Sequence, residues 1–192
     1  METALRIILG RALPGLPVRF VPFNGKTDLL RRLPGVLRGY ASYLPTAGGR
    51  LVVVVDRDDD DCHALVASIR AAIEDSGLRV DRENGEGDVL CRVSCEELEA
   101  WFFGDIAAVR QVYPRVPDSL GSRAAYRDPD AIAGGTWESL EVVLQQAGYM
   151  RGGLRKVALA ESVAPHMDLA NNTSRSFQVT IAGIRRLVGR AA

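Results

Sequence analysis

Lysine is nearly absent from this chain of 192 residues: Lys26 and Lys156 are the only lysines among 24 basic residues, and the rest are arginines. We attribute this bias mainly to coding DNA rich in G and C, although arginine also suits phosphate binding. With three cysteines and two histidines in the whole chain, a structural zinc site of about four such ligands is not expected. No run of about 18 apolar residues occurs, so we expect no membrane contact.

The cysteines are odd in number, and the N-terminus lacks the pattern of a secretory signal. Both features predict a reducing compartment, the cytoplasm. Cys91 and Cys95 are spaced so that they share one face of a strand, most simply a buried face.

The formal net charge of zero hides a pattern along the chain, because residues 51–150 hold 20 of the 24 acidic side chains. The residues before and after that range carry an excess of arginine. Two interpretations stay open. The acidic middle is either a carboxylate site among phosphate-attracting surfaces or a solvated acidic face.

Strands alternate with helices in the first part of the chain. The apolar pattern predicts strands at 18–23, 50–55 and 88–94, and helices at 2–13, 27–44, 62–77 and 95–113. For the second helix, Thr27 is the expected cap and Pro34 a kink or break. This alternation indicates an α/β fold with a mostly parallel sheet flanked by helices.

After Pro114 the strand signals stop. Residues 114–135 are rich in Pro, Asp, Arg and Gly and predict a long ordered loop. Helices are expected near 136–148, 154–164 and 174–189, with Ser and Thr of "NNTSRSF" capping the last one. We therefore expect an α/β core over residues 1–113 and a helical C-terminal subregion over 114–192 packed on that core.

The segment "RLVVVVDRDDDD" holds the strongest chemical signal. Asp56 ends a buried strand, where ligand sites of parallel sheets lie, and Asp58 follows two residues later, so both carboxylates can point the same way. Two such oxygen ligands suit Mg²⁺ or Mn²⁺. The last three aspartates, Asp59 to Asp61, are expected to cap the following helix instead.

A second acidic group follows the strand at 88–94. Glu96, Glu97 and Glu99 open the next helix, and Asp105 lies further along. Acidic residues in a first turn often serve only the helix dipole. In a parallel sheet, however, this helix would start at the same edge as Asp56, so a site with one or two metal ions for phosphoryl chemistry is also predicted.

"LVVVVDRDD", the later "VSCEELEAWFFGD" and the C-terminal "GGLRKVALAESVAPHMDLANNTSRSF" together resemble the TOPRIM-like proteins of a bacterial family of unknown function. The resemblance covers nearly the whole chain after residue 20. It implies a D-x-D pair that binds Mg²⁺, at Asp56 and Asp58, and a further acidic position of the OLD-type branch at Glu99. It also implies a catalytic lysine near the phosphate, at Lys156.

The function implied by this resemblance is metal-dependent cleavage of nucleic acid. Related proteins are often encoded beside ATPases in phage defence, so the alternative is a non-catalytic partner of an ATPase. The first TOPRIM strand, ending in Glu-Gly or Glu-Glu, is absent, since the chain starts at Met1-Glu2-Thr3. Either the start lies upstream or this glutamate is lost. An upstream start predicts exposed strand edges and pairing of chains into a homo-oligomer.

Other motifs point mostly to structure. "NGKTDLL" is not a Walker sequence, because Phe20 stands where glycine is needed, although Lys26 could contact phosphate. The aromatic residues Trp101 to Phe103, and also Trp137, are expected in the core. His63 is expected on the helix surface.

Overall fold

The computed structural model describes residues 1–56, 61–94, 98–150, 152–153 and 155–189. The chain forms two compact units, each described by itself. Unit 1 comprises Met1–Phe20 and Glu96–Val179, and unit 2 comprises Val21–Cys95 and Thr180–Ala192. These bounds differ from the expected division after residue 113, because each unit is assembled from two separate stretches of the chain.

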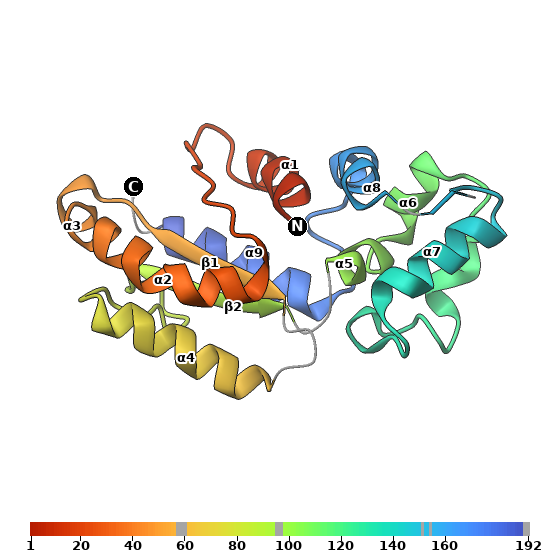
Figure 1. Cartoon of the computed structure of the whole chain (residues 1–192). Coiled ribbons are helices and arrows are strands. Elements are labelled where there is room, and N and C mark those ends of the chain that lie inside the picture. Colours follow the sequence, from red (N-terminus) through yellow and green to blue (C-terminus); the bar gives the residue numbers. More distant parts are fainter. Residues whose placement is uncertain (57–60, 95–97, 151, 154, 190–192) are drawn as a thin grey trace. The chain divides into compact units, whose positions relative to one another are not determined.

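Unit 2 contains a parallel two-stranded sheet. Strands β1 (Leu51–Asp56) and β2 (Val89–Ser94) pair in register from Leu51 opposite Val89 to Asp56 opposite Ser94. The helices of this unit are α2 (Gly25–Ala41), α3 (Leu44–Ala47) and α4 (Cys62–Asp75). The expected α/β class with a parallel sheet flanked by helices is thus confirmed (Figure 1).

One face of this sheet packs against α2 and α4. Leucines recur every fourth residue on α2, and apolar residues recur with the same spacing on α4, which gives each helix one buried stripe. These stripes meet alternate residues of the strands, as the strand period of two requires. The residues of this core include Leu29, Leu33, Leu37, Leu65, Ile69, Ile73, Val53, Val55, Val89 and Cys91.

The other face of the sheet carries Leu90 and Arg92, whose side chains alternate with the core residues above. Helix α9 (Arg175–Val188) enters unit 2 at Thr180. A Cβ atom added at Gly183 of α9 would meet the Arg92 guanidinium. Glycine at this position therefore lets the arginine lie directly against the helix backbone, and the sheet is covered on both faces.

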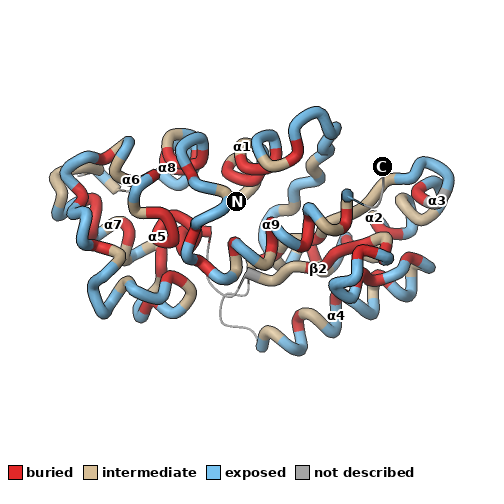
Figure 2. The backbone as a smooth tube through the Cα atoms, turned by 180° about the vertical axis from the view of Figure 1, so that it is seen from behind, coloured by how far each residue is buried: buried red, intermediate tan, exposed pale blue. Residues whose placement is uncertain are grey.

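Unit 1 is helical and is built around α5 (Glu99–Phe103), a short helix buried along its length (Figure 2). Trp101, Phe102 and Phe103 of this helix are at most 2% exposed. The predicted core placement of these aromatics is confirmed. The elements of the unit, besides the start of α9, are α1 (Glu2–Ala12), α5 (Glu99–Phe103), α6 (Ile106–Val112), η1 (Asp118–Ser122), η2 (Pro129–Ala131), α7 (Thr136–Gln146), α8 (Lys156–Val163) and η3 (Ala164–His166).

The predicted strand at 18–23 is wrong: these residues are in neither a helix nor a strand. Pro17 and Pro22 lack the N–H that a sheet ladder needs. Val18 is 41% exposed and Val21 is 36% exposed. The alternation of apolar residues here does not reflect a buried sheet face.

Two details of the expected helices also differ. Helix α2 starts at Gly25, so Thr27 lies inside it and is not its cap, and Pro34 lies within the helix without ending it. The helix expected at 95–113 is divided, because Gly104 ends α5 and the Asp105 carboxylate accepts a hydrogen bond from the Ala108 N–H to start α6.

None of the helices in the described part of the chain combines the length and apolarity needed to span a membrane.

Candidate functional site

Asp56 is the last residue of β1 and lies opposite Ser94 at the end of β2. Its side chain is partly buried at the carboxyl edge of the parallel sheet, where ligand sites of such sheets lie. Asp56 thus ends the strand, and its role as a metal ligand stays a prediction. Asp58, the second expected ligand, lies outside the described residues, as do Glu96 and Glu97.

Asp61 begins α4 as its N-cap. Its carboxylate accepts hydrogen bonds from the backbone N–H groups of Ala64, at 3.1 Å, and His63, at 2.7 Å. These bonds hold the Asp61 pKa below its usual range. The predicted capping role is confirmed for Asp61, whereas Asp59 and Asp60 lie outside the described residues. His63 is exposed on the helix, as expected.

Glu99 and Lys156, the two residues predicted to act in catalysis, lie together in unit 1. Glu99 is the first residue of α5 and is 4% exposed, and Lys156 is the first residue of α8. The Lys156 Nζ atom lies 4.0 Å from Glu99 Oε1, and the lysine side chain is 50% exposed. A cation beside a buried carboxylate offsets part of the cost of removing that charge from water.

Trp137 also contacts this lysine. The Lys156 Nζ atom lies 4.2 Å from the centre of the Trp137 ring, within the range of a cation–π contact. Trp137 is only partly buried, so its predicted core position is wrong. The tryptophan ring and the glutamate carboxylate thus both contact the ammonium group of this half-exposed lysine.

Asp56 belongs to unit 2 and Glu99 to unit 1, so their combination in one metal centre stays a prediction. No group of three His, Cys, Asp or Glu side chains suited to a metal ion occurs within the described ranges. The donor chemistry of Asp56 nevertheless fits Mg²⁺, which keeps several waters and needs only one or two carboxylates. Burial raises the pKa of the Cys91 thiol to about 11.

A polar network in unit 1, which the sequence did not predict, joins the end of α5 to the segment before α9. The Asn172 side chain donates to the Trp101 carbonyl at 2.8 Å, and its Oδ1 atom accepts from the Ser174 N–H at 2.9 Å. A Cβ atom at Gly104 would meet Asn172 Oδ1 and would lie 2.7 Å from Ser174 N. Only glycine at position 104 leaves room for this connection.

Asp130 fixes the start of α9. Its carboxylate accepts from Ser174 Oγ at 2.8 Å and from the N–H groups of Arg175, at 2.5 Å, and Ser176, at 3.2 Å. Ser174 Oγ in turn accepts from the Phe177 N–H at 3.2 Å, which confirms the expected serine cap. Asp130 lies in the sequence Asp128-Pro129-Asp130, which is typical of a turn. Nothing in that sequence identifies the helix that Asp130 caps.

Comparisons with known proteins give one result. A family model described as "Domain of unknown function (DUF4276)" matches residues 1–185. No curated protein and no solved structure matches the chain.

Proposed function

We propose that this chain, which belongs to the DUF4276 family of domains of unknown function, hydrolyses phosphodiester bonds of nucleic acid with a divalent metal ion. The observation that supports this most is the position of Asp56 at the carboxyl end of a parallel strand. In the sequence, Asp58 follows two residues later, as the second acid of the D-x-D pair. We place this reaction in the cytoplasm, because an odd number of cysteines favours a reducing compartment.

In this proposal Asp56 and Asp58 hold Mg²⁺ or Mn²⁺. The metal, when bound, supplies an activated water and neutralises charge on the scissile phosphate. Lys156 binds a non-bridging phosphate oxygen, since its side chain is half-exposed and carries a positive charge. Glu99 positions that ammonium group through their ion pair.

Calorimetric titration with MnCl₂ tests the metal site. The wild-type chain should bind Mn²⁺, and Asp56→Asn and Asp58→Asn should each lose most of the binding heat, because each removes one anionic ligand. Asp75→Asn, at the exposed end of α4, is the matched control and should bind as the wild type does. Binding that all four proteins share would contradict the assignment of these ligands.

Cleavage of a labelled oligonucleotide in Mn²⁺ tests the activity. Lys156→Gln should lower the rate by about tenfold or more, the effect expected when a charged phosphate contact is lost. Arg38→Gln, at an exposed position of α2, is the control, and it should keep the wild-type rate. If no variant or wild-type protein binds metal or cleaves, the proposal fails and the alternative, a non-catalytic partner of an ATPase, takes its place.

A further inference from the structure

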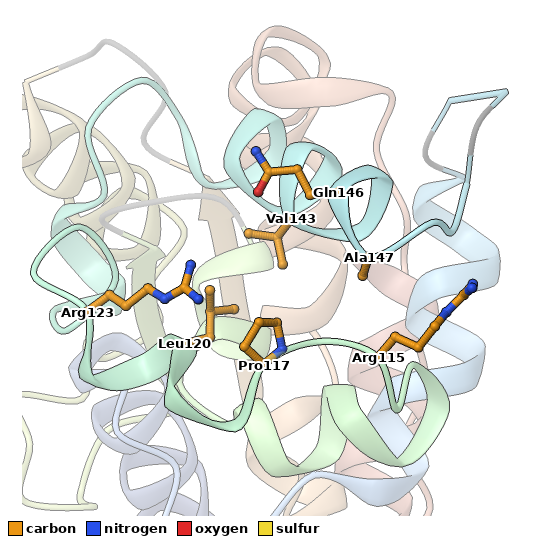
Figure 3. A pocket seen from close by; sticks show the side chains of 7 residues that line it. All are labelled: Arg115, Pro117, Leu120, Arg123, Val143, Gln146 and Ala147. Atoms are coloured by element: carbon orange, nitrogen blue, oxygen red, sulfur yellow. The ribbon is translucent and has the colours of Figure 1, made fainter.

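Two surfaces of the molecule differ in what they offer a partner. In unit 1 a hollow lies between α7 and the segment around η1, and Figure 3 shows the residues that line it. Leu120 is 1% exposed there and Val143 is 4% exposed, so this hollow presents little apolar surface to a ligand. The sheet of unit 2 instead has an open edge at β1, which presents backbone groups to a partner.

The backbone groups of β1 alternate between the two sides of the strand. Leu51 donates its N–H to the Asp88 carbonyl at 2.9 Å and pairs with Val89 of β2. In a parallel ladder, residues whose groups face the partner strand alternate with residues whose groups face away. The N–H and C=O groups of Val52 and Val54 therefore point away from β2, and among the described residues no backbone hydrogen bond joins them to another segment.

The far edge of the sheet, on β2, is closed at its start by the preceding segment. The Val89 N–H donates to the Arg79 carbonyl at 3.1 Å, and the Val89 carbonyl accepts from the Asp81 N–H at 2.8 Å. Within the described part of unit 2, β1 has no such cover. Residues 51–55 also contain no proline, glycine or charge, which are among the features that keep natural strand edges from pairing. The edge of β1 thus favours pairing with another strand.

The valine side chains along this edge are also left partly uncovered. Val52 and Val54 are partly buried, whereas Leu90 of β2, which lies beside Val52 in the register, is 0% exposed. This face of the sheet is therefore fully covered over Leu90 and only partly covered over β1. A further strand beside β1 would remove apolar surface of both valines from water, which is favourable.

We propose that β1 of a second copy of this chain pairs with this edge in antiparallel orientation about a twofold axis. The valine run presents the same edge on both copies, so the contact is self-complementary, as a twofold interface requires. This pairing occupies the open β1 edge of each copy, so the assembly closes as a dimer. The homo-oligomer expected from open strand edges would then be this dimer.

Backbone geometry and charge together select the register of the two strands. Both residues of a hydrogen-bonded pair must direct their backbone groups outward, so even-numbered residues of β1 oppose even-numbered residues of the copy. The registers that overlap most of the strand place Val52 opposite either Val54 or Asp56. With Val52 opposite Val54, Arg50 lies opposite Asp56. Opposite charges in directly opposed positions stabilise a strand pair, so this register is favoured.

The Arg50–Asp56 pair lies at the carboxyl edge of the sheet and occurs twice in the dimer. A carboxylate has two oxygens with about four lone-pair positions. Asp56 can therefore accept from the arginine of the second copy with one oxygen and keep the other for a metal ion. No contact of the dimer uses the metal, so the inference is independent of the proposed cleavage and is tested in EDTA.

Analytical ultracentrifugation over a series of protein concentrations in EDTA tests the dimer. The wild type should sediment as a dimer. Val54→Pro removes an N–H that the second copy uses while keeping the bonds between β1 and β2, so it should raise the dissociation constant about tenfold or more. Val93→Pro is the matched control and should stay a dimer, because Val93 is also partly buried and its N–H faces away from β1 on the edge of β2.

An exchange of charges tests the register. Arg50→Asp and Asp56→Arg each place like charges opposite one another, so each should raise the dissociation constant about tenfold. The double variant Arg50→Asp/Asp56→Arg restores opposite charges and should dimerise as the wild type does. Circular dichroism checks that every variant is folded, and if Val54→Pro is not, the charge exchange still tests the interface.

Several results would overturn the inference. A monomeric wild type would leave the β1 edge to a strand of a different chain, and species larger than a dimer would contradict the closed twofold pairing. Equal weakening by Val54→Pro and Val93→Pro would place the interface elsewhere. A double charge variant that dimerises as weakly as the single variants would exclude the pairing of Arg50 with Asp56.

Discussion

Each unit holds a buried carboxylate opposite a cation at about the same distance. In unit 2, Asp81 Oδ2 lies 3.8 Å from Arg186 Nη2, and in unit 1, Glu99 Oε1 lies 4.0 Å from Lys156 Nζ. The exposures also agree, at 3% for Asp81 and 4% for Glu99. Each pair thus joins a buried carboxylate to a basic side chain, and the two pairs differ in the groups that surround them.

The surroundings of Asp81 are backbone. Its Oδ1 atom accepts from the Gly85 N–H at 2.7 Å and lies 3.5 Å from the Gly87 N–H, which closes the turn that leads into β2. Lys156 of the other pair is instead half-exposed and lies over the Trp137 ring. The Asp81 carboxylate, which binds backbone N–H groups, shapes the chain, whereas the role that we propose for the Glu99–Lys156 pair is contact with a phosphate.

The largest expected effect comes from Gly87→Ala. The added Cβ would meet the backbone N and Cα of Asp81 and lie 2.6 Å from the Val80 carbonyl carbon, and backbone atoms cannot move aside as a flexible side chain can. We expect a loss of about 3 kcal/mol or more in the free energy of unfolding, measured by urea denaturation. Gly35→Ala in α2, where an added Cβ meets nothing within 4 Å, should be neutral or slightly stabilising.

Isosteric changes of the two carboxylates test the comparison directly. Asp81→Asn should cost about 3 kcal/mol in the free energy of unfolding, because it leaves the buried guanidinium atoms of Arg186 uncompensated. Glu99→Gln should cost about 1 kcal/mol, since half-exposed Lys156 can turn to water, yet it should lower the rate of the proposed cleavage by as much as Lys156→Gln does. Equal losses of stability in urea denaturation would contradict the separation of roles.

The sequence predicted most elements of the fold because their buried stripes are regular. The leucines of α2 and the valines of β1 follow the helix and strand periods, and both elements formed near the expected bounds. The error at 18–23 arose because apolar alternation alone says nothing of whether a partner strand exists, and two prolines oppose pairing. The split at Gly104 was also missed, although Asp105, which starts α6 as its cap, is a local signal.

The candidate site was predicted in part. The carboxyl end of a strand identifies Asp56 by physical reasoning, because topology fixes where parallel strands end. Lys156 came only from the family resemblance, since no local spacing connects it with Glu99. Trp137 could not be assigned to this pair from sequence, because a tryptophan on an amphipathic helix gives the same signal whether it faces the core or a lysine.

A smaller effect concerns Cys91, in the core of unit 2. Burial raises the pKa of its thiol from 9.0 to about 11, so the folded chain keeps a proton that the unfolded chain releases in that range. The free energy of unfolding should therefore fall as the pH rises from 9 to 11, by about 1.4 kcal/mol at pH 10. Urea denaturation of wild type and Cys91→Val at pH 7 and 10 isolates this contribution, and an unchanged difference between them would contradict it.

The smallest expected effect, and the sharpest test of unit 1, comes from Lys156→Gln. Because the lysine is 50% exposed, losing its ion pair and cation–π contact should cost only about 0.5 kcal/mol. The Trp137 fluorescence should nevertheless change, since the cation 4.2 Å from the ring centre is removed, whereas the buried Trp101 should not respond. Lys26→Gln, on α2, should leave the spectrum unchanged. Lys156→Gln could instead lose as much stability as Asp81→Asn and leave the fluorescence unchanged. Lys156 would then be a structural counterion like Arg186, and the proposed contact of Lys156 with phosphate would lose its basis.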